Sequence, residues 1–222
     1  MNRQSMREAA YRRLGEPTGS AQVRLTGTAM SSLIYEGCRE TSRVSRAILG
    51  SASTGVTAQK VELVMASAML WPPHWVEYKN WATTTASATA FKELTKTTIE
   101  ELYRTVGQSW RIVTGVPTNW FETNRQRLGL WPKPTGSQGG TATIWGPRLA
   151  RTLPTDTATT DLPVGLHLKP VFYACREAMI AVPELDPNGI RWRVFDALWR
   201  EGLPRDVQVP HPGGLSFRGR WR

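Results

Sequence analysis

Tryptophan is distributed unevenly along this chain of 222 residues. Seven of the ten tryptophans fall between residues 71 and 145, in a stretch that is also rich in threonine, glycine and proline. Aromatic and β-branched residues favour strands, while frequent glycine and proline interrupt helices. The region 56–147 is therefore predicted to be β-rich, in a chain whose two ends follow a different pattern.

Alternation of apolar and polar residues divides this region into short strands. A turn at Asn124-Arg125 joins two of them into a hairpin. One helix interrupts the strands, since Thr97-Thr98-Ile99-Glu100 has the form of a capping box followed by an apolar stripe. The predicted strands cover 60–65, 75–81, 120–123, 126–131 and 141–145.

Apolar residues at helical spacing predict two helices before the β-rich region and two after it. Gly50 stands where a C-terminal cap of the second helix belongs, and Asp186 is placed to cap the last one. Each helix has one apolar stripe to bury, so the four are expected to pack together. The predicted helices cover 2–14, 28–49, about 166–180 and 190–198.

The predicted fold class is thus α+β: a four-helix bundle with an inserted small β-rich lobe and an extended C-terminal tail. We expect residues 28–49 to pack on 166–200. The tail is rich in proline and glycine and cannot form a core of its own. The predicted parts are 1–55 and 148–203 for the bundle, 56–147 for the insertion with its short helix, and 204–222 for the tail.

The chain is basic, with 28 lysines and arginines against 18 acidic residues, a net charge of +10. No run of five or six like charges occurs, so the excess fits either DNA or an acidic protein partner. Arg39, Arg43 and Arg46 fall at helical spacing and form a candidate basic face toward DNA or a partner. A plain solvated helix face is the alternative.

Aromatic residues and arginines alternate at the end of the chain. These residue types are enriched at the hot spots of protein interfaces, and this segment has no core to join. We therefore predict that the segment binds either a neighbouring subunit or the protein on which the assembled chain docks. The predicted residues are Phe217, Arg218, Arg220, Trp221 and Arg222.

Nothing in the sequence indicates catalysis. His74, His167 and His211 are far apart and lack metal-ligand spacing, and no nucleophile elbow or phosphate-binding loop occurs. Cys38 and Cys175 are too few for a disulfide framework and are interpreted as buried free thiols in a reducing cytoplasm. No membrane helix or secretory signal is expected. We predict a protein that is not an enzyme and needs no metal or cofactor.

Three segments, in order, resemble the head-to-tail adaptor family of tailed bacteriophages, the connector or neck proteins. The first is the opening pair of helices, with Arg-Leu-Gly from Arg13 and Tyr-Glu-Gly-Cys-Arg-Glu from Tyr35. The second runs from Gly115 to Pro134 and is similar to the family's "GxPxxY…(I/L)xLxPxP" hairpin. The third, Asp161 to His167, is similar to its "DxPxLPxxxH" segment. The many tryptophans and the arginine-rich end depart from the family pattern.

The resemblance implies a structural subunit of the virion neck, assembled in the host cytoplasm. It implies a homo-oligomeric ring, usually of about twelve copies, that docks on the portal protein and joins it to stopper or tail proteins. DNA would pass through the ring with weak, non-specific contacts, and no cofactor is implied. Two alternatives remain: a basic structural or RNA-binding subunit of another large assembly, such as a ribosome-associated or mitochondrial complex, and an enzyme of unrecognised type.

Overall fold

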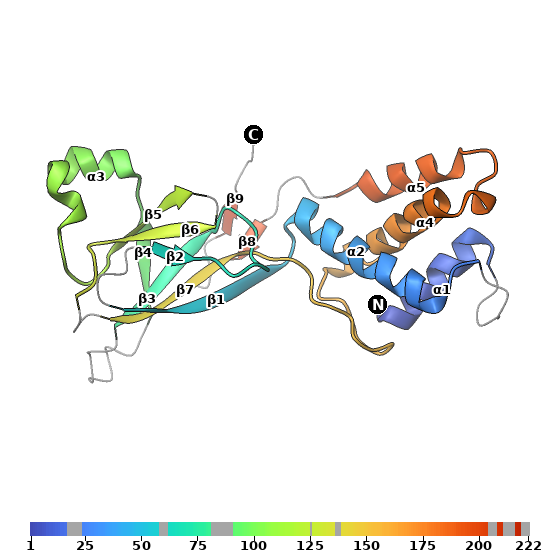
Figure 1. Cartoon of the computed structure of the whole chain (residues 1–222), viewed down its shortest axis with the longest axis horizontal. Coiled ribbons are helices and arrows are strands. Elements are labelled where there is room, and N and C mark those ends of the chain that lie inside the picture. Colours follow the sequence, from blue (N-terminus) through green and yellow to red (C-terminus); the bar gives the residue numbers. More distant parts are fainter. Residues whose placement is uncertain are drawn as a thin grey trace. The chain divides into compact units, whose positions relative to one another are not determined.

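The chain folds into two compact units in the computed structural model (Figure 1). The helical unit comprises Met1–Ile48 and Arg148–Arg222, and the sheet unit comprises Leu49–Pro147. The structure describes residues 1–16, 24–57, 62–80, 91–124, 126–135 and 139–203, together with the backbone of 208–210 and 216–218.

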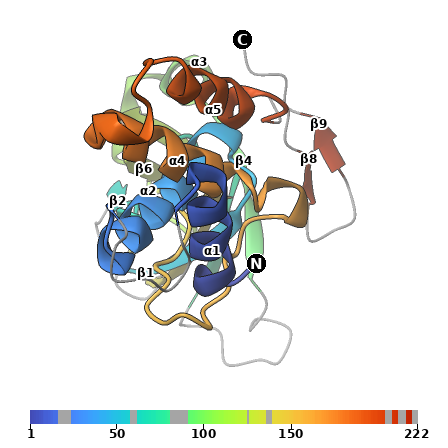
Figure 2. The ribbon, with the colours of Figure 1, turned by 90° about the vertical axis from the view of Figure 1, so that its right-hand side faces the viewer.

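Four α-helices lie among the described residues of the helical unit, and α4 contacts each of the other three (Figure 2). Their buried faces carry mostly aliphatic and sulfur-containing side chains, such as Met30, Ile34 and Val171. The helices are α1 (Arg3–Leu14), α2 (Gly27–Ser45), α4 (Lys169–Ala181) and α5 (Arg191–Arg200), with 3-10 turns η4 (Val164–Leu166) and η5 (Pro183–Leu185).

The helix ends follow local chemistry. The side chain of Asn2 accepts a hydrogen bond from the backbone N–H of Ser5 and so caps α1. Asp186 accepts from the backbone N–H groups of Ile190 and Trp192 at the start of α5, which confirms it as a cap. The predicted cap at Gly50 is wrong. α2 ends earlier, at Arg46, which takes the left-handed conformation with φ 52°.

α2 and α4 approach each other closely at Gly37. A Cβ atom at this position would lie 2.8 Å from the carbonyl oxygen of Pro170 and 3.1 Å from the Cβ of Tyr173. Only glycine leaves room for this approach, and the packing of residues 28–49 on 166–200 is confirmed. Cys38, one residue further along α2, is fully buried in the same core.

The described residues of the sheet unit form a seven-stranded mixed sheet, in the order β1-β7-β3-β4-β5-β6-β2. β4 and β5 are parallel, and the other neighbours are antiparallel. The strands are β1 (Leu49–Val56), β2 (Glu62–Val64), β3 (Trp75–Asn80), β4 (Lys92–Lys96), β5 (Asn119–Asn124), β6 (Arg127–Trp131) and β7 (Gly140–Pro147).

The chain enters and leaves this unit through paired strands. Leu49 in β1 lies opposite Pro147 in β7, and the pairing continues for eight residues on each strand. Just outside the sheet, the backbone N–H of Arg148 donates to the carbonyl oxygen of Ile48 at 2.9 Å. The two connections to the helical unit are therefore hydrogen-bonded neighbours.

Both faces of the sheet carry apolar side chains, because successive residues of a strand point to opposite sides. Trp120 packs with Leu128 and Leu130 in one core, while its neighbour Phe121 packs with Trp110 in another. The second core lies under α3 (Ile99–Val106) and the 3-10 turn η2 (Gly107–Arg111). The capping box that starts α3 is one residue later than predicted, formed by Thr98 and Glu101.

The predicted fold class is wrong in its proportions. The chain has five α-helices among its described residues, and its β part is a seven-stranded mixed sheet with cores of its own, where a small lobe was expected. Two strands were missed. β1 is rich in serine and glycine, which are not typical of strands, and three of the five residues of β4 are charged with only Leu94 buried.

The end of the chain also differs from a plain extended tail. β8 (Gln208–Pro210) and β9 (Ser216–Arg218) pair as a two-stranded antiparallel sheet. Across the described segments, none of the helices combines the length and apolar character that crossing a bilayer requires.

Candidate partner-binding surfaces

The predicted basic face of α2 is only partly assembled. Arg39 and Arg43 are exposed on one side of the helix, one turn apart. Arg46 stands at the helix end, half-buried and outside the helical period because of its left-handed backbone. Arg43 donates to Glu40 at 2.6 Å, a hydrogen bond that raises the pKa of Arg43. Arg39 lies over the ring of Tyr35 at 5.7 Å, so both exposed arginines already have local partners.

The predicted partner-binding residues near the C-terminus are placed only in part. Phe217 and Arg218 belong to β9. Arg220, Trp221 and Arg222 lie outside the described residues. Binding through this segment stays a prediction.

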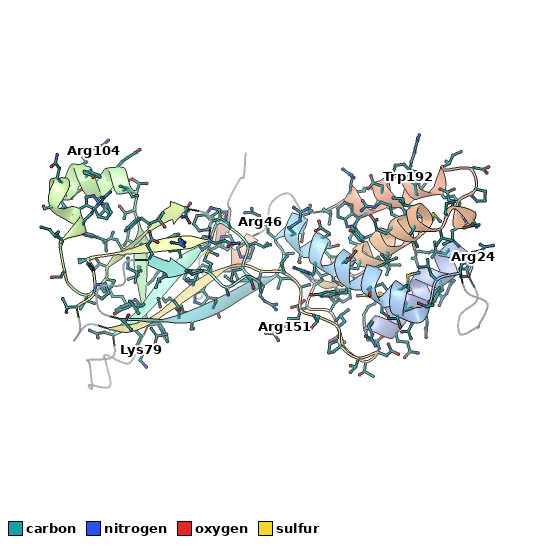
Figure 3. The ribbon with its side chains drawn as sticks, in the orientation of Figure 1. Arg24, Arg46, Lys79, Arg104, Arg151 and Trp192 are labelled. Atoms are coloured by element: carbon teal, nitrogen blue, oxygen red, sulfur yellow. The ribbon has the colours of Figure 1, made fainter. Side chains whose placement is uncertain are left out.

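Cations are spread over both units, as the labelled side chains of Figure 3 show. Many hold the fold together. Arg3 and Arg7 of α1 both donate to Asp156, and these hydrogen bonds, that of Arg7 first, lower the pKa of the Asp156 carboxyl. Arg148 reaches Asp161 at 2.5 Å in the same unit. Part of the positive excess is therefore structural and does not face a partner.

The segment from Gly115 to Pro134 forms one continuous piece. Its two halves run along β5 and β6, which pair as the predicted hairpin. The N–H of Thr118 donates to the carbonyl oxygen of Trp131 at 3.0 Å, and a Cβ at Gly115 would touch Pro132 at 3.4 Å. The N–H of Gly115 also donates to the carbonyl oxygen of Lys133 at 2.9 Å, so the two ends of the segment lie side by side.

The segment from Asp161 to His167 closes on itself. The Nε2 atom of His167 lies 2.8 Å from the carbonyl oxygen of Leu162, and its Nδ1 atom lies 2.9 Å from the amino group of Met1. Both ring nitrogens are engaged, so the ring ties the N-terminus to the loop before α4. Searching the described ranges finds no group of three or more His, Cys, Asp or Glu side chains able to hold a metal ion.

The two cysteines lie in the helical core. Burial raises the pKa of Cys38 to about 11 and that of Cys175 to about 12. A thiol with so high a pKa is a poor nucleophile at neutral pH. These side chains serve packing, as the sequence indicated.

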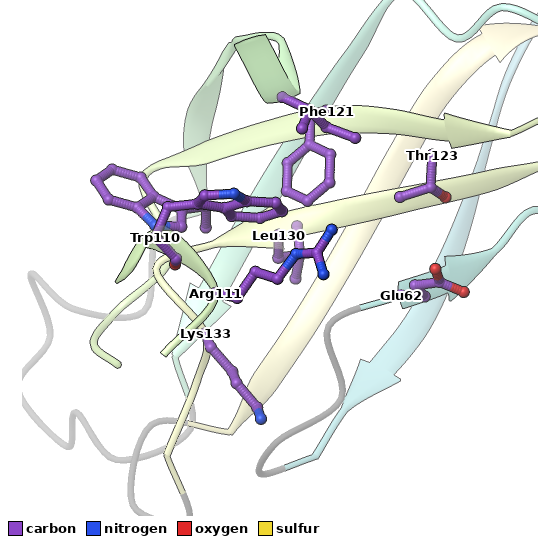
Figure 4. Close-up of a pocket in the computed structure, with 9 residues that line it drawn as sticks. Glu62, Trp110, Arg111, Phe121, Thr123, Leu130 and Lys133 are labelled. Carbon is purple, nitrogen blue, oxygen red and sulfur yellow. The ribbon is translucent and has the colours of Figure 1, made fainter. Parts of the chain in front are cut away.

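A cavity of about 350 Å³ opens on the sheet unit beside η2 (Figure 4). One wall is apolar, and charged side chains stand around it. Figure 4 shows Arg111 reaching from the Trp110 side toward Thr123 and Glu62, with Lys133 below it. The cavity is lined by Glu62, Ile99, Trp110, Arg111, Phe121, Thr123, Leu130, Trp131 and Lys133.

The aromatic wall is rigidly built. Trp110 is 5% exposed and meets Phe121 edge-to-face, with ring centroids 5.5 Å apart. The indole of Trp131 donates to the carbonyl oxygen of Trp110 at 3.0 Å. Gly129 leaves space for the Phe121 ring, since a Cβ there would lie 2.1 Å from it. The wall is therefore preformed and does not depend on a ligand.

Two of the side chains that line this cavity are cations. Neither Arg111 nor Lys133 forms an ion pair with any described residue, whereas Glu62 across the opening is paired with Arg127 at 3.1 Å. The guanidinium of Arg111 lies 5.4 Å from the ring centre of Trp110. The site offers an apolar wall and two uncompensated positive charges, a combination that suits an acidic apolar ligand.

The sequence did not single out this cavity. Its lining comes from β2, α3, η2, β5, β6 and the residues after β6, which are up to about seventy positions apart. The Trp110-Arg111 pair was the available signal, and it has the same form as the Arg-Trp pairs noticed at the chain end.

Comparisons with family models and with curated proteins find no match. Among solved structures, the chain is similar to one described as the neck of an empty GTA particle computed with C6 symmetry. The two share 16% sequence identity with a TM-score of 0.30, and the match covers 94% of this chain and 92% of the other.

Proposed function

We propose that this chain is a structural head-to-tail adaptor of a tailed bacteriophage. Copies form a ring that docks on the portal protein and joins it to stopper or tail proteins around the DNA channel. The proposal assigns no catalysis. Its partners are the portal, the neighbouring subunits and the protein below the ring.

One observation carries the proposal. The segment from Gly115 to Pro134, which resembles the adaptor hairpin in sequence, is a single hairpin whose two ends are joined by a hydrogen bond from the N–H of Gly115 to the carbonyl oxygen of Lys133 at 2.9 Å. The segment from Asp161 to His167 also behaves as a unit and leads directly into α4. Two segments that carry the resemblance are thus discrete structural pieces, in the order that the family has them.

The physical character of the chain fits such a role. Ring assembly multiplies many modest interfaces, so each subunit needs stable units and exposed contact surfaces more than deep pockets. The net charge of +10 is spread over both units, which suits weak contact with passing DNA better than reading of its bases.

Deleting the gene tests the proposal. The expected result is DNA-filled heads without tails, and the purified chain added to an extract of these heads should restore attachment. Electron microscopy of particles carrying a tagged chain should place the tag at the head-tail junction. Tailed particles in the absence of the protein, or a tag found elsewhere in the virion, would contradict the proposal.

Size-exclusion chromatography with light scattering supplies a second measurement. The purified chain should elute as a monomer and shift to a larger species when purified portal is added. Tight RNA binding at physiological salt, with no shift on adding portal, would favour the alternative of a nucleoprotein subunit.

A further inference from the structure

We propose that the cavity beside η2 binds a short acidic-aromatic segment of a partner protein. The segment inserts an apolar side chain against Trp110 and Phe121 and places a carboxylate at Arg111 and Lys133. The inference rests on the proposed function only in taking the partner to be another virion protein. The site itself is argued from the geometry of the sheet unit.

The size of the cavity sets the first limit. At about 350 Å³ it is near the lower end of the range of about 300–1,000 Å³ for ligand sites, so it admits one large side chain with its backbone. The buried Nε1 of Trp110 donates to no described residue. This atom is closed off from solvent, so it lies behind the cavity surface and a ligand in the cavity meets the indole elsewhere.

Charge decides which segment fits. Arg111 and Lys133 are the cations without an ion-pair partner at this site, and one carboxylate can be approached by both. The chain's own end, from Ser216 to Arg222, has three arginines and no acidic residue. The same charges would repel that segment in a second copy, and we take the occupant to be an acidic segment of a different protein.

A nucleic acid strand fits less well. Single-stranded bases stack on open aromatic faces, but Trp110 is 5% exposed, meets Phe121 and Tyr103 edge-to-face and has Arg111 over its ring. The cavity accepts a side chain at its wall and leaves no face for a base.

The proposed segment needs both a carboxylate and an apolar side chain, and four probes test these two needs separately on the full-length protein. They are the peptides acetyl-Asp-Phe-Asp-amide, acetyl-Asn-Phe-Asn-amide and acetyl-Asp-Ala-Asp-amide, and an oligothymidylate. The readout is the ¹H–¹⁵N resonance of the Trp110 indole, titrated with each probe. We expect saturable shifts with the first peptide and affinity at least about tenfold weaker for the next two, since each lacks one of the two interactions.

The matched variants are Arg111→Glu with Lys133→Glu, and Lys92→Glu as control, because Lys92 is exposed on β4 and does not line the cavity. The double variant should lose the acidic peptide by at least about tenfold, while the control binds as the unchanged chain does. The remaining tryptophan indole resonances should stay in place in both, which shows that the fold is intact.

Absence of saturable binding by the acidic phenylalanine peptide overturns the proposal, as does equal affinity for its asparagine counterpart. Oligothymidylate binding that is lost in the double variant would assign the site to nucleic acid instead. The titration involves no heads or portal. If the peptide does not bind, the adaptor role is therefore not contradicted. If the chain does not restore attachment to heads, the peptide site is not contradicted.

Discussion

Replacing Gly37 by alanine should destabilise the helical unit, although the same change at most helical positions stabilises a protein. At an open helical site the substitution stabilises by about 1 kcal/mol. Here the new Cβ would lie 2.9 Å from the Cα of Pro170, whereas carbon atoms in contact prefer about 3.5–4.0 Å. α4 would have to retreat by at least about 0.6 Å, since the opposing atoms are backbone and cannot rotate away.

Overpacking of this kind costs about 1–3 kcal/mol, and rigid backbone on the far side favours the upper end. Subtracting the gain in helix propensity leaves a net loss of about 2 kcal/mol. Because the chain has two units, a local measurement is preferable: hydrogen exchange of the α2 and α4 amides followed by mass spectrometry. A loss of about 2 kcal/mol corresponds to exchange about 30-fold faster.

Gly165→Ala is the matched control, since a Cβ at Gly165 would meet nothing within 4 Å. Exchange in α2 and α4 should be unchanged in this variant. Unchanged or slower exchange in Gly37→Ala would refute the clash, and equal acceleration in the control would show that the effect does not come from the α2–α4 contact.

Three further predictions follow from particular residues. The pKa of Asp156 is lowered in the fold, so the carboxylate stabilises the fold fully above its unfolded pKa of about 3.9, and this stabilisation is lost as pH falls through the folded pKa. The Asp156→Asn variant should therefore lose less stability than the unchanged chain as the pH falls below about 4, measured by circular dichroism. Cys38 and Cys175 should react with a thiol reagent at pH 8 about a hundredfold more slowly in the native chain than in urea, because burial raises both pKa values. Gly129→Ala should displace the ring of Phe121 and weaken near-ultraviolet dichroism, and an unchanged spectrum would show that the ring has room to move.

The helices were predictable because their signals are local. The apolar stripe of α1 and the capping residue Asp186 act within one or two turns, so spacing alone identifies them. The sheet was harder to predict from the sequence, because strands such as β4 are stabilised by neighbouring strands that lie far along the chain. β4 itself buries a single residue and so shows little apolar alternation. The end of α2 was misplaced because Arg46, a residue that seldom takes a positive φ, caps the helix where glycine was expected.

The candidate surfaces show the same division. Arg39 and Arg43 share a face as helical spacing requires, but the sequence could not show that Glu40 and Tyr35 already occupy them. The cavity beside η2 depends on which strands pair, and no spacing rule reports that. Trp110 was counted among the tryptophans of the β-rich region without any sign that it forms a wall.

The paired entry and exit of the sheet unit have a consequence for how such chains diversify. Ile48 and Arg148 are already bonded to each other, so the stretch between them behaves like a hairpin loop of unusual size. Closing a loop between ends that are held together costs only slightly more as the loop lengthens. Over evolutionary time the whole sheet unit can therefore be exchanged, enlarged or trimmed as a cassette, while the helices keep their connectivity.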